Sequence, residues 1–123
     1  MDDQSMLEPN IVPQPKTAAE YQVRGYAFYA KGDYPAAQAD FLQAIGLDPA
    51  DVEAVYALGL TYKVQGRLDE GINAFQRALD LIDSGVIADA TRAKMLARLA
   101  RGHLNKMTIG DWNLEKEIWK RSE

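Results

Sequence analysis

The feature that most constrains this chain is an internal repeat of 34 residues. When residues 18–51 are laid on residues 52–85, the two segments match at small and aromatic positions along their length. The matched pairs are Gly25 with Gly59, Gly32 with Gly66, Phe41 with Phe75, Ala44 with Ala78, and Leu47 with Leu81. A repeat of this kind predicts stacked copies of one supersecondary unit, each covering its neighbour.

The spacing of apolar residues indicates that the unit is helical. Apolar side chains recur every three or four residues over 21–47 and again over 55–82, and no segment alternates for long enough to form a strand. Glycine followed by a polar residue marks short turns at 32–33, 66–67 and 110–111. The pattern predicts helices near 18–31, 34–47, 50–65, 68–82, 87–108 and 111–121.

Local residues predict where two of these helices begin. Thr17 and Glu20 have the spacing of a capping box, in which each side chain accepts a hydrogen bond from the other residue's amide. Asp48 followed by Pro49 suits the start of the third helix, because Asp caps and Pro tolerates the first helical position. Residues 1–16 contain three prolines and are expected to form a flexible or extended arm.

The two glycines of each copy have different expected roles. Gly25 and its counterpart Gly59 allow the two helices of a hairpin to approach closely, while the second glycine makes the turn between them. The phenylalanine of each copy, Phe41 or Phe75, is expected to fill the space between hairpins. The core is therefore predicted to repeat with the sequence.

These residues resemble the tetratricopeptide repeat (TPR) family, whose unit is a helix-turn-helix of 34 residues. Only Arg24 in the first copy falls where an apolar residue is usual. The first copy carries the signature residues Tyr21, Gly25, Phe28, Gly32, Tyr34, Ala37, Phe41, Ala44 and Pro49. The second copy carries Leu58, Gly59, Tyr62, Gly66, Leu68, Phe75 and Ala78.

A third copy is displaced and departs further from the pattern. Leu99, Gly102 and Leu104 precede the last turn, and Trp119 falls where the phenylalanine falls in the other copies. The resemblance implies an all-α fold, a right-handed α-α superhelix of about three TPR hairpins. The expected domain covers 17–123, with repeats at about 18–51, 52–85 and 87–121.

The resemblance also implies a function, because TPR arrays hold partner peptides on the concave side formed by their first helices. Tyrosines suit such a surface, since they combine a large apolar area with one polar tip. The alternative is that some of them pack between helices. The expected groove residues are Gln22, Tyr26, Tyr29, Glu53, Tyr56, Leu60 and Lys63.

A second candidate surface is basic. Residues 91–110 contain several bases and no acid, although the chain has a formal net charge of −4. Lys94, Arg98, Arg101 and Asn105 lie on one side of a helix by their spacing. This basic stripe could receive an acidic peptide, and the alternative is a solvated outer face.

The TPR carboxylate clamp that binds chaperone C-termini is not expected here. Gln22, Tyr26 and Ala57 occupy three of its positions, and Arg101 alone matches the pattern. The sequence therefore predicts an acidic protein or peptide as partner, but it does not identify which one.

No residue pattern supports catalysis or a metal site. The chain has no cysteine and one histidine, His103, which is expected to be a packed or surface residue. Its aspartates lie at predicted helix starts, where capping explains them. We therefore expect no enzyme activity, no cofactor and no metal.

Charge and hydropathy bear on compartment and partners. A pI near 5.0 argues against general binding to nucleic acid. The first residues are acidic, and no apolar run approaches the ~18 residues of a membrane span. These features predict a cytoplasmic protein that binds neither membrane nor nucleic acid.

The alternative function is structural self-association. The last predicted helix is short and charged, yet it carries large apolar residues and no polar helix follows to cover them. Either these residues bury within the third hairpin, or a second copy covers them, with the N-terminal arm as another contact. The candidate self-association residues are Trp112, Ile118 and Trp119.

Overall fold

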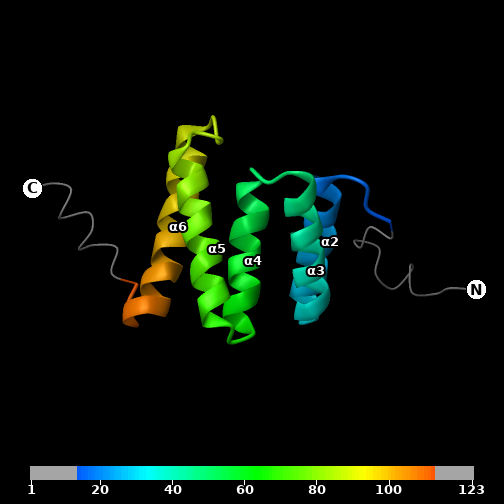
Figure 1. Cartoon of the computed structure of the whole chain (residues 1–123), viewed down its shortest axis with the longest axis horizontal. Coiled ribbons are helices and arrows are strands. Elements are labelled where there is room, and N and C mark those ends of the chain that lie inside the picture. The colour runs from blue at the N-terminus through cyan, green and yellow to red at the C-terminus, as the bar shows by residue number, and fades with distance from the viewer. Residues whose placement is uncertain (1–13, 113–123) are drawn as a thin grey trace, which may run out of the picture.

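The computed structural model describes residues 14–112, and this part of the chain contains helices and turns but no strand. Five helices follow one another along it (Figure 1). They are α2 (Ala18–Lys31), α3 (Tyr34–Leu47), α4 (Val52–Val64), α5 (Leu68–Asp83) and α6 (Ala90–Ile109). The predicted all-α fold is confirmed.

Each helix packs against the next one in the chain. Helices α2 and α3 form one hairpin and α4 and α5 a second, and α3 packs on α4 as α5 packs on α6. Figure 1 shows the helices standing side by side, with α2, α4 and α6 running in the same direction. The first helices of successive hairpins therefore present corresponding ends to the same edge of the molecule.

The start of α2 differs in one detail from the predicted capping box. The Thr17 hydroxyl accepts a hydrogen bond from the Glu20 amide at 3.1 Å, as expected. The Glu20 carboxylate, however, accepts from the amide of Lys16 at 2.8 Å and not from that of Thr17. The carboxylate thus fixes the residue before the cap, which holds the incoming chain against the helix.

The predicted start of the third helix was wrong by two residues. Helix α4 begins at Val52 with Asp51 as its cap, because the Asp51 carboxylate accepts from the Ala54 amide at 3.1 Å. Asp48 instead closes the turn before the helix by accepting from the Ala50 amide. Two aspartates three residues apart both had capping chemistry, and the one that reaches the third helical amide sets the boundary.

The close-packing glycines lie where the repeat predicted them. A Cβ atom on Gly25 would stand 2.7 Å from the Phe41 ring, and one on Gly59 would stand 2.8 Å from the Phe75 ring. Both rings are fully buried. Each hairpin therefore closes by placing a phenylalanine of its second helix on a glycine of its first helix.

Helix α6 carries the same feature, but a different aromatic residue fills it. The indole of Trp112 lies against Gly102, at a contact that leaves no room for a Cβ atom. The sequence placed Trp119 in this role, and Trp119 lies outside the described residues. Trp112 takes the position because the chain turns at Gly110, whose φ of 74° is left-handed, and comes straight back over α6.

Candidate functional site

The expected groove residues share one face of the two hairpins. On α4, Glu53, Tyr56, Leu60 and Lys63 are separated by three, four and three residues, which places them on one side of the helix. On α2 the corresponding residues are Gln22, Tyr26 and Tyr29. We call the surface formed by these side chains the inner face.

Polar contacts join α2, α4 and α6 along the inner face, and two of them add α6 to it. The Gln22 amide donates to both carboxylate oxygens of Asp51, at 3.0 and 3.1 Å. Glu53 forms an ion pair with Arg92 of α6. Near the other end of α4, Nζ of Lys63 lies 2.9 Å from Nδ1 of His103. Polar contacts thus join α2 to α4 at one edge of the face and α4 to α6 at both edges.

The middle of the inner face is apolar and partly open to solvent. The Tyr26 side chain is 39% exposed and meets the buried Phe41 ring edge-on at 5.2 Å. Tyr56 meets Phe75 in the same way at 5.7 Å. Burial raises the pKa of both tyrosines. Each ring therefore packs partly between helices and lies partly at the surface.

Tyr29 is the third tyrosine of this surface. Its ring packs edge-on against Tyr34 at 5.3 Å, within the first hairpin. Burial is the main cause that raises its pKa, followed by the nearby Tyr34. Tyr29 therefore contributes to the edge of the inner face.

His103 lies at the centre of an aromatic cluster. Its ring stacks on Phe75 at 5.2 Å with an interplanar angle of 11°, and it meets Trp112 edge-on at 4.9 Å. Tyr56 lies 5.9 Å away. Burial and then the charge of Lys63 lower the pKa of His103 from 6.5 to about 4. The ring is therefore neutral at pH 7.

The tautomer of His103 follows from its partner. An ammonium group can only donate, so Nδ1 must accept from Lys63 and the ring proton lies on Nε2. The Nε2 proton points away from Nζ of Lys63, because the two nitrogens of an imidazole ring face in widely different directions. Neither nitrogen of this ring presents a free lone pair to a metal.

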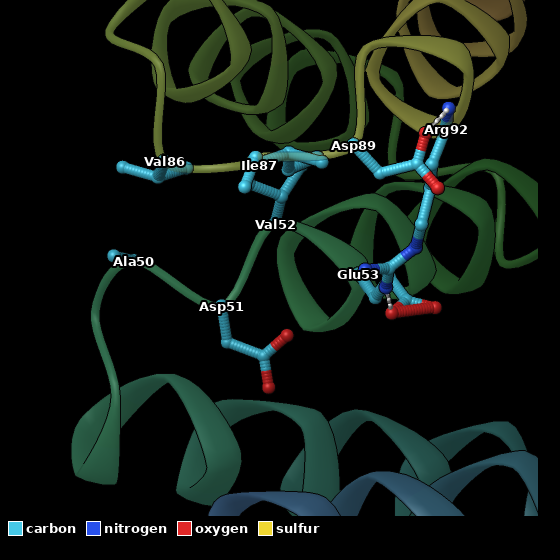
Figure 2. Close-up of a pocket in the computed structure, with 9 residues that line it drawn as sticks. Ala50, Asp51, Val52, Glu53, Val86, Ile87, Asp89 and Arg92 are labelled. Carbon is cyan, nitrogen blue, oxygen red and sulfur yellow. Dashed lines mark hydrogen bonds and ion pairs between the residues drawn. The ribbon is translucent and has the colours of Figure 1, made fainter.

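A pocket of about 390 Å³ lies where α4 and α6 begin, at the edge of the inner face away from the contact of Lys63 with His103 (Figure 2). Figure 2 shows the segment around Val86 facing Ala50, with Arg92 reaching down to Glu53. The lining residues are Ala50, Asp51, Val52, Glu53, Val86, Ile87, Ala88, Asp89 and Arg92.

The carboxylates that line this pocket form hydrogen bonds or ion pairs within the described chain. Asp51 and Asp89 cap α4 and α6 by accepting backbone hydrogen bonds. Burial raises the pKa of Asp51, although the Ala54 amide opposes this effect. Helix capping therefore accounts for Asp51 and Asp89, and the ion pair with Arg92 accounts for Glu53.

The structure separates the basic stripe from the inner face. Arg101 follows Arg92 by nine residues, which is two and a half helical turns, so the two side chains leave opposite sides of α6. Lys94 and Arg98 are exposed, while Asn105 is half-buried and donates to the backbone carbonyl of Trp112 at 2.9 Å. The stripe is a second surface and does not continue the first.

Of the candidate self-association residues, Trp112 alone lies in the described part of the chain. It is half-buried against Gly102 and His103. Ile118 and Trp119 lie outside the described residues.

Sequence reasoning missed three inner-face residues, Arg92, Leu99 and His103. One signal could have found His103: Gly102 matches Gly59, so the residue that follows it corresponds to Leu60. Leu99 precedes His103 by one turn and is 36% exposed. Arg92 has no such signal, because the longer connection between α5 and α6 breaks the repeat before it.

Two further kinds of feature are absent from residues 14–112. In the described range no helix has the length and apolar character needed to cross a membrane. Residues 14–112 also contain no group of three potential metal ligands.

Comparisons with known proteins agree with the repeat pattern. A family model described as tetratricopeptide repeat matches residues 23–86. The TPR repeat-containing protein MJ1428 of Methanocaldococcus jannaschii is 25% identical over 75 residues, covering 61% of this chain and 13% of that protein. The crystal structure of MamA matches with a TM-score of 0.57 and 26% identity, covering 87% of this chain and 62% of MamA. The chain thus spans less than two thirds of either relative.

Proposed function

Because the chain belongs to the tetratricopeptide repeat family, whose members generally mediate protein–protein interaction, we propose that it holds a segment of a partner protein on its inner face. The observation that carries this proposal is the partly open apolar centre of that face, bounded by polar contacts at both edges. TPR proteins are typically non-catalytic scaffolds, and we assign this chain the same non-catalytic role.

The chemistry of the inner face selects a kind of partner. Tyr26, Leu60 and Leu99 offer apolar area to apolar side chains, and burying it supplies about 25 cal/mol per Å² before the costs of association. Lys63 adds positive charge near one end of α4. The proposed partner segment therefore combines apolar residues with an acidic one.

The basic stripe is a separate proposal within the same function. Lys94 and Arg98 are exposed on the side of α6 away from Arg92, where they attract an acidic region of the same partner. Attraction between exposed charges weakens over a Debye length of about 8 Å at physiological salt. We therefore expect association to slow as salt increases.

The test compares inner-face variants with a matched surface variant. Tyr26→Lys and Leu99→Lys place a charge in the apolar centre, while their long stems keep part of the original packing. Leu42→Lys on α3 is the control, since Leu42 is 44% exposed and lies on a helix outside the inner face. Circular dichroism melts of all three variants establish that they fold.

The readout is affinity for a purified partner. Proteins captured by the wild-type chain are purified, and their binding is measured by calorimetry against each variant. We expect the two inner-face variants to lose about tenfold or more in affinity, equivalent to about 1.4 kcal/mol, and Leu42→Lys to bind as the wild type does. Equal affinity of all variants for every purified partner would refute the inner face as the binding surface.

A further inference from the structure

Helix α2 has an apolar side that stays open to solvent within residues 14–112. Val23 lies at its centre and is 52% exposed, and Ala27 and Ala30 follow four and seven residues later on the same side. In the second copy of the repeat, Val23 corresponds to Ala57 and Ala27 to Thr61, which are 1% and 0% exposed. We call the side of α2 formed by Val23, Ala27 and Ala30 the end face.

The second copy shows which kind of contact this side makes inside the array. Ala57 packs in one cluster with Ala37 and Phe41 of α3, so the equivalent side of α4 holds the preceding helix. Within residues 14–112 no helix precedes α2. Because an apolar face at the end of a repeat array is a liability for solubility, we expect something to cover it.

One difference between the copies disfavours a helix as the cover. Ala54 on α4 is 0% exposed, and its counterpart on α2 is Glu20. A helix packed on α2 as α3 packs on α4 would bury the Glu20 carboxylate, and burying a charge without an opposite charge is costly. This argues against a stacked copy of the chain and against a helical partner on the end face.

The chain that enters α2 is held on this side of the helix. Glu20 precedes Val23 by three residues and Ala27 by seven, so its side chain leaves α2 on the side of the end face. Its carboxylate accepts from the Lys16 amide at 2.8 Å, and Pro15 is half-buried. Figure 1 shows this segment at the start of α2, on the side away from α4. The incoming chain therefore lies toward the end face and not toward the inner face.

The residues before this segment have the reach and the composition to cover the end face. An extended chain with prolines advances about 3 Å per residue, twice the rise of a helix. Continued along α2 from Lys16, it brings Ile11 and Val12 level with Ala27. Both are apolar, and Pro13 favours an extended conformation at Val12. Ile11, Val12 and Pro13 lie outside the described residues.

We propose that residues 11–13 lie along the end face of α2, with the side chains of Ile11 and Val12 against it. The segment caps the first hairpin at the place where α3 covers the second. As a consequence, the chain covers this end of the array by itself and does not stack there on a second copy. The contact does not involve the inner face, so the proposal is independent of the proposed function.

Disulfide trapping tests the position, because the chain has no cysteine of its own. Val12→Cys is combined with Ala27→Cys on the end face. The control combines Val12→Cys with Tyr29→Cys, two residues further along α2 but on the inner face. Both full chains are oxidised at low concentration after circular dichroism has shown that they fold. Non-reducing gels and mass spectrometry then distinguish bonds within one chain from bonds between chains.

We expect the Ala27 pair to close within one chain about tenfold faster than the Tyr29 pair. A disulfide needs Cα atoms within about 7 Å, and a docked segment raises the effective concentration of one cysteine at the other. Faster closure of the Tyr29 pair, or equal rates for the two pairs, would overturn the proposal. Bonds formed mainly between chains would overturn it as well, because a second copy would then cover the end face.

Thermal melts test whether the contact stabilises the fold. Ile11→Ser together with Val12→Ser should lower the melting temperature by about 4 °C or more. Val23→Ser should lower it less in that background than in the wild type, because both changes remove the same contact. Leu42→Ser on α3, where Leu42 is 44% exposed, is the control and should have the same effect in both backgrounds. Additive effects of Val23→Ser and the double serine variant would show that the segment does not touch α2.

Discussion

Arg24 and Asp40 form a two-bond ion pair inside the first hairpin, with Nε to Oδ2 and Nη2 to Oδ1 both at 2.8 Å. Asp40 is 3% exposed, and its hydrogen bond is the main cause that raises the pKa of Arg24. In the second copy of the repeat, Leu58 and Ala74 occupy these two positions, and both are buried. The same two positions of the repeat thus hold an ion pair in the first hairpin and two buried apolar residues in the second.

The ionic and apolar pairs predict how single and double substitutions at Arg24 and Asp40 change the free energy of unfolding. Asp40→Ala should lower the free energy of unfolding by about 2–3 kcal/mol, because it leaves the guanidinium partly buried without its carboxylate. Arg24→Leu together with Asp40→Ala recreates the second copy's pair and should recover most of that loss. Urea denaturation followed by circular dichroism measures both. A double variant as unstable as Asp40→Ala would contradict the equivalence of the two hairpins.

Two glycines on helices should respond oppositely to the same substitution. Gly59→Ala should lower the free energy of unfolding by about 1–3 kcal/mol, since its new Cβ atom meets the Phe75 ring. Gly46→Ala is the control, because nothing lies within 4 Å of its Cβ position on α3. It should stabilise the chain by up to about 1 kcal/mol through helix propensity. Thermal melts compare them, and similar losses in both would show that the Phe75 contact is unimportant.

The neutral ring of His103 predicts a stability that depends on pH. The folded chain binds this proton with a pKa of about 4, whereas the unfolded chain has the ordinary value of 6.5. Between these values the unfolded state binds more protons, so stability falls as pH is lowered from 6.5 to 4. Because the ring is only half-buried, we expect a loss of about 1–2 kcal/mol.

A variant isolates the contribution of His103 to this dependence. His103→Leu introduces the residue that the repeat places at Leu60, and it should flatten the fall in stability over that range. The raised pKa of Asp51 has the opposite sign, since a carboxyl group that resists ionisation stabilises the folded state as pH falls. Asp51 is present in both proteins, so the difference between their urea denaturation curves reports His103 alone. Parallel pH profiles would contradict the neutral ring.

Self-association through the end of the chain remains a prediction with its own measurement. If Ile118 and Trp119 contact a second copy, the mass measured by light scattering should rise above 13.7 kDa with concentration. Trp119→Glu should then return the chain to a monomer, because a buried charge at such a contact is costly. A mass that stays constant over the concentration range refutes this mode of assembly.

The repeat in the sequence determined most of the fold. Matching glycines predicted two helical hairpins, their turns and the close approach of two helices at Gly25 and at Gly59. These features depend on residues that lie a fixed number of positions apart within each copy of the repeat, and the sequence shows those positions directly. Helix ends were less well determined, because both Asp48 and Asp51 can cap and only the folded backbone selects one.

The composition of the inner face was decided by the tertiary structure. The sequence placed Tyr26, Tyr56 and Lys63 on one surface, but it assigned His103 no role there and left open which side of the molecule the basic stripe occupies. The contacts of α6 with α4 bring His103 to Lys63 and turn Arg101 to the other side. Residue spacing fixes which side chains share a face of one helix, whereas the rotation of that helix against its neighbour depends on packing between distant segments.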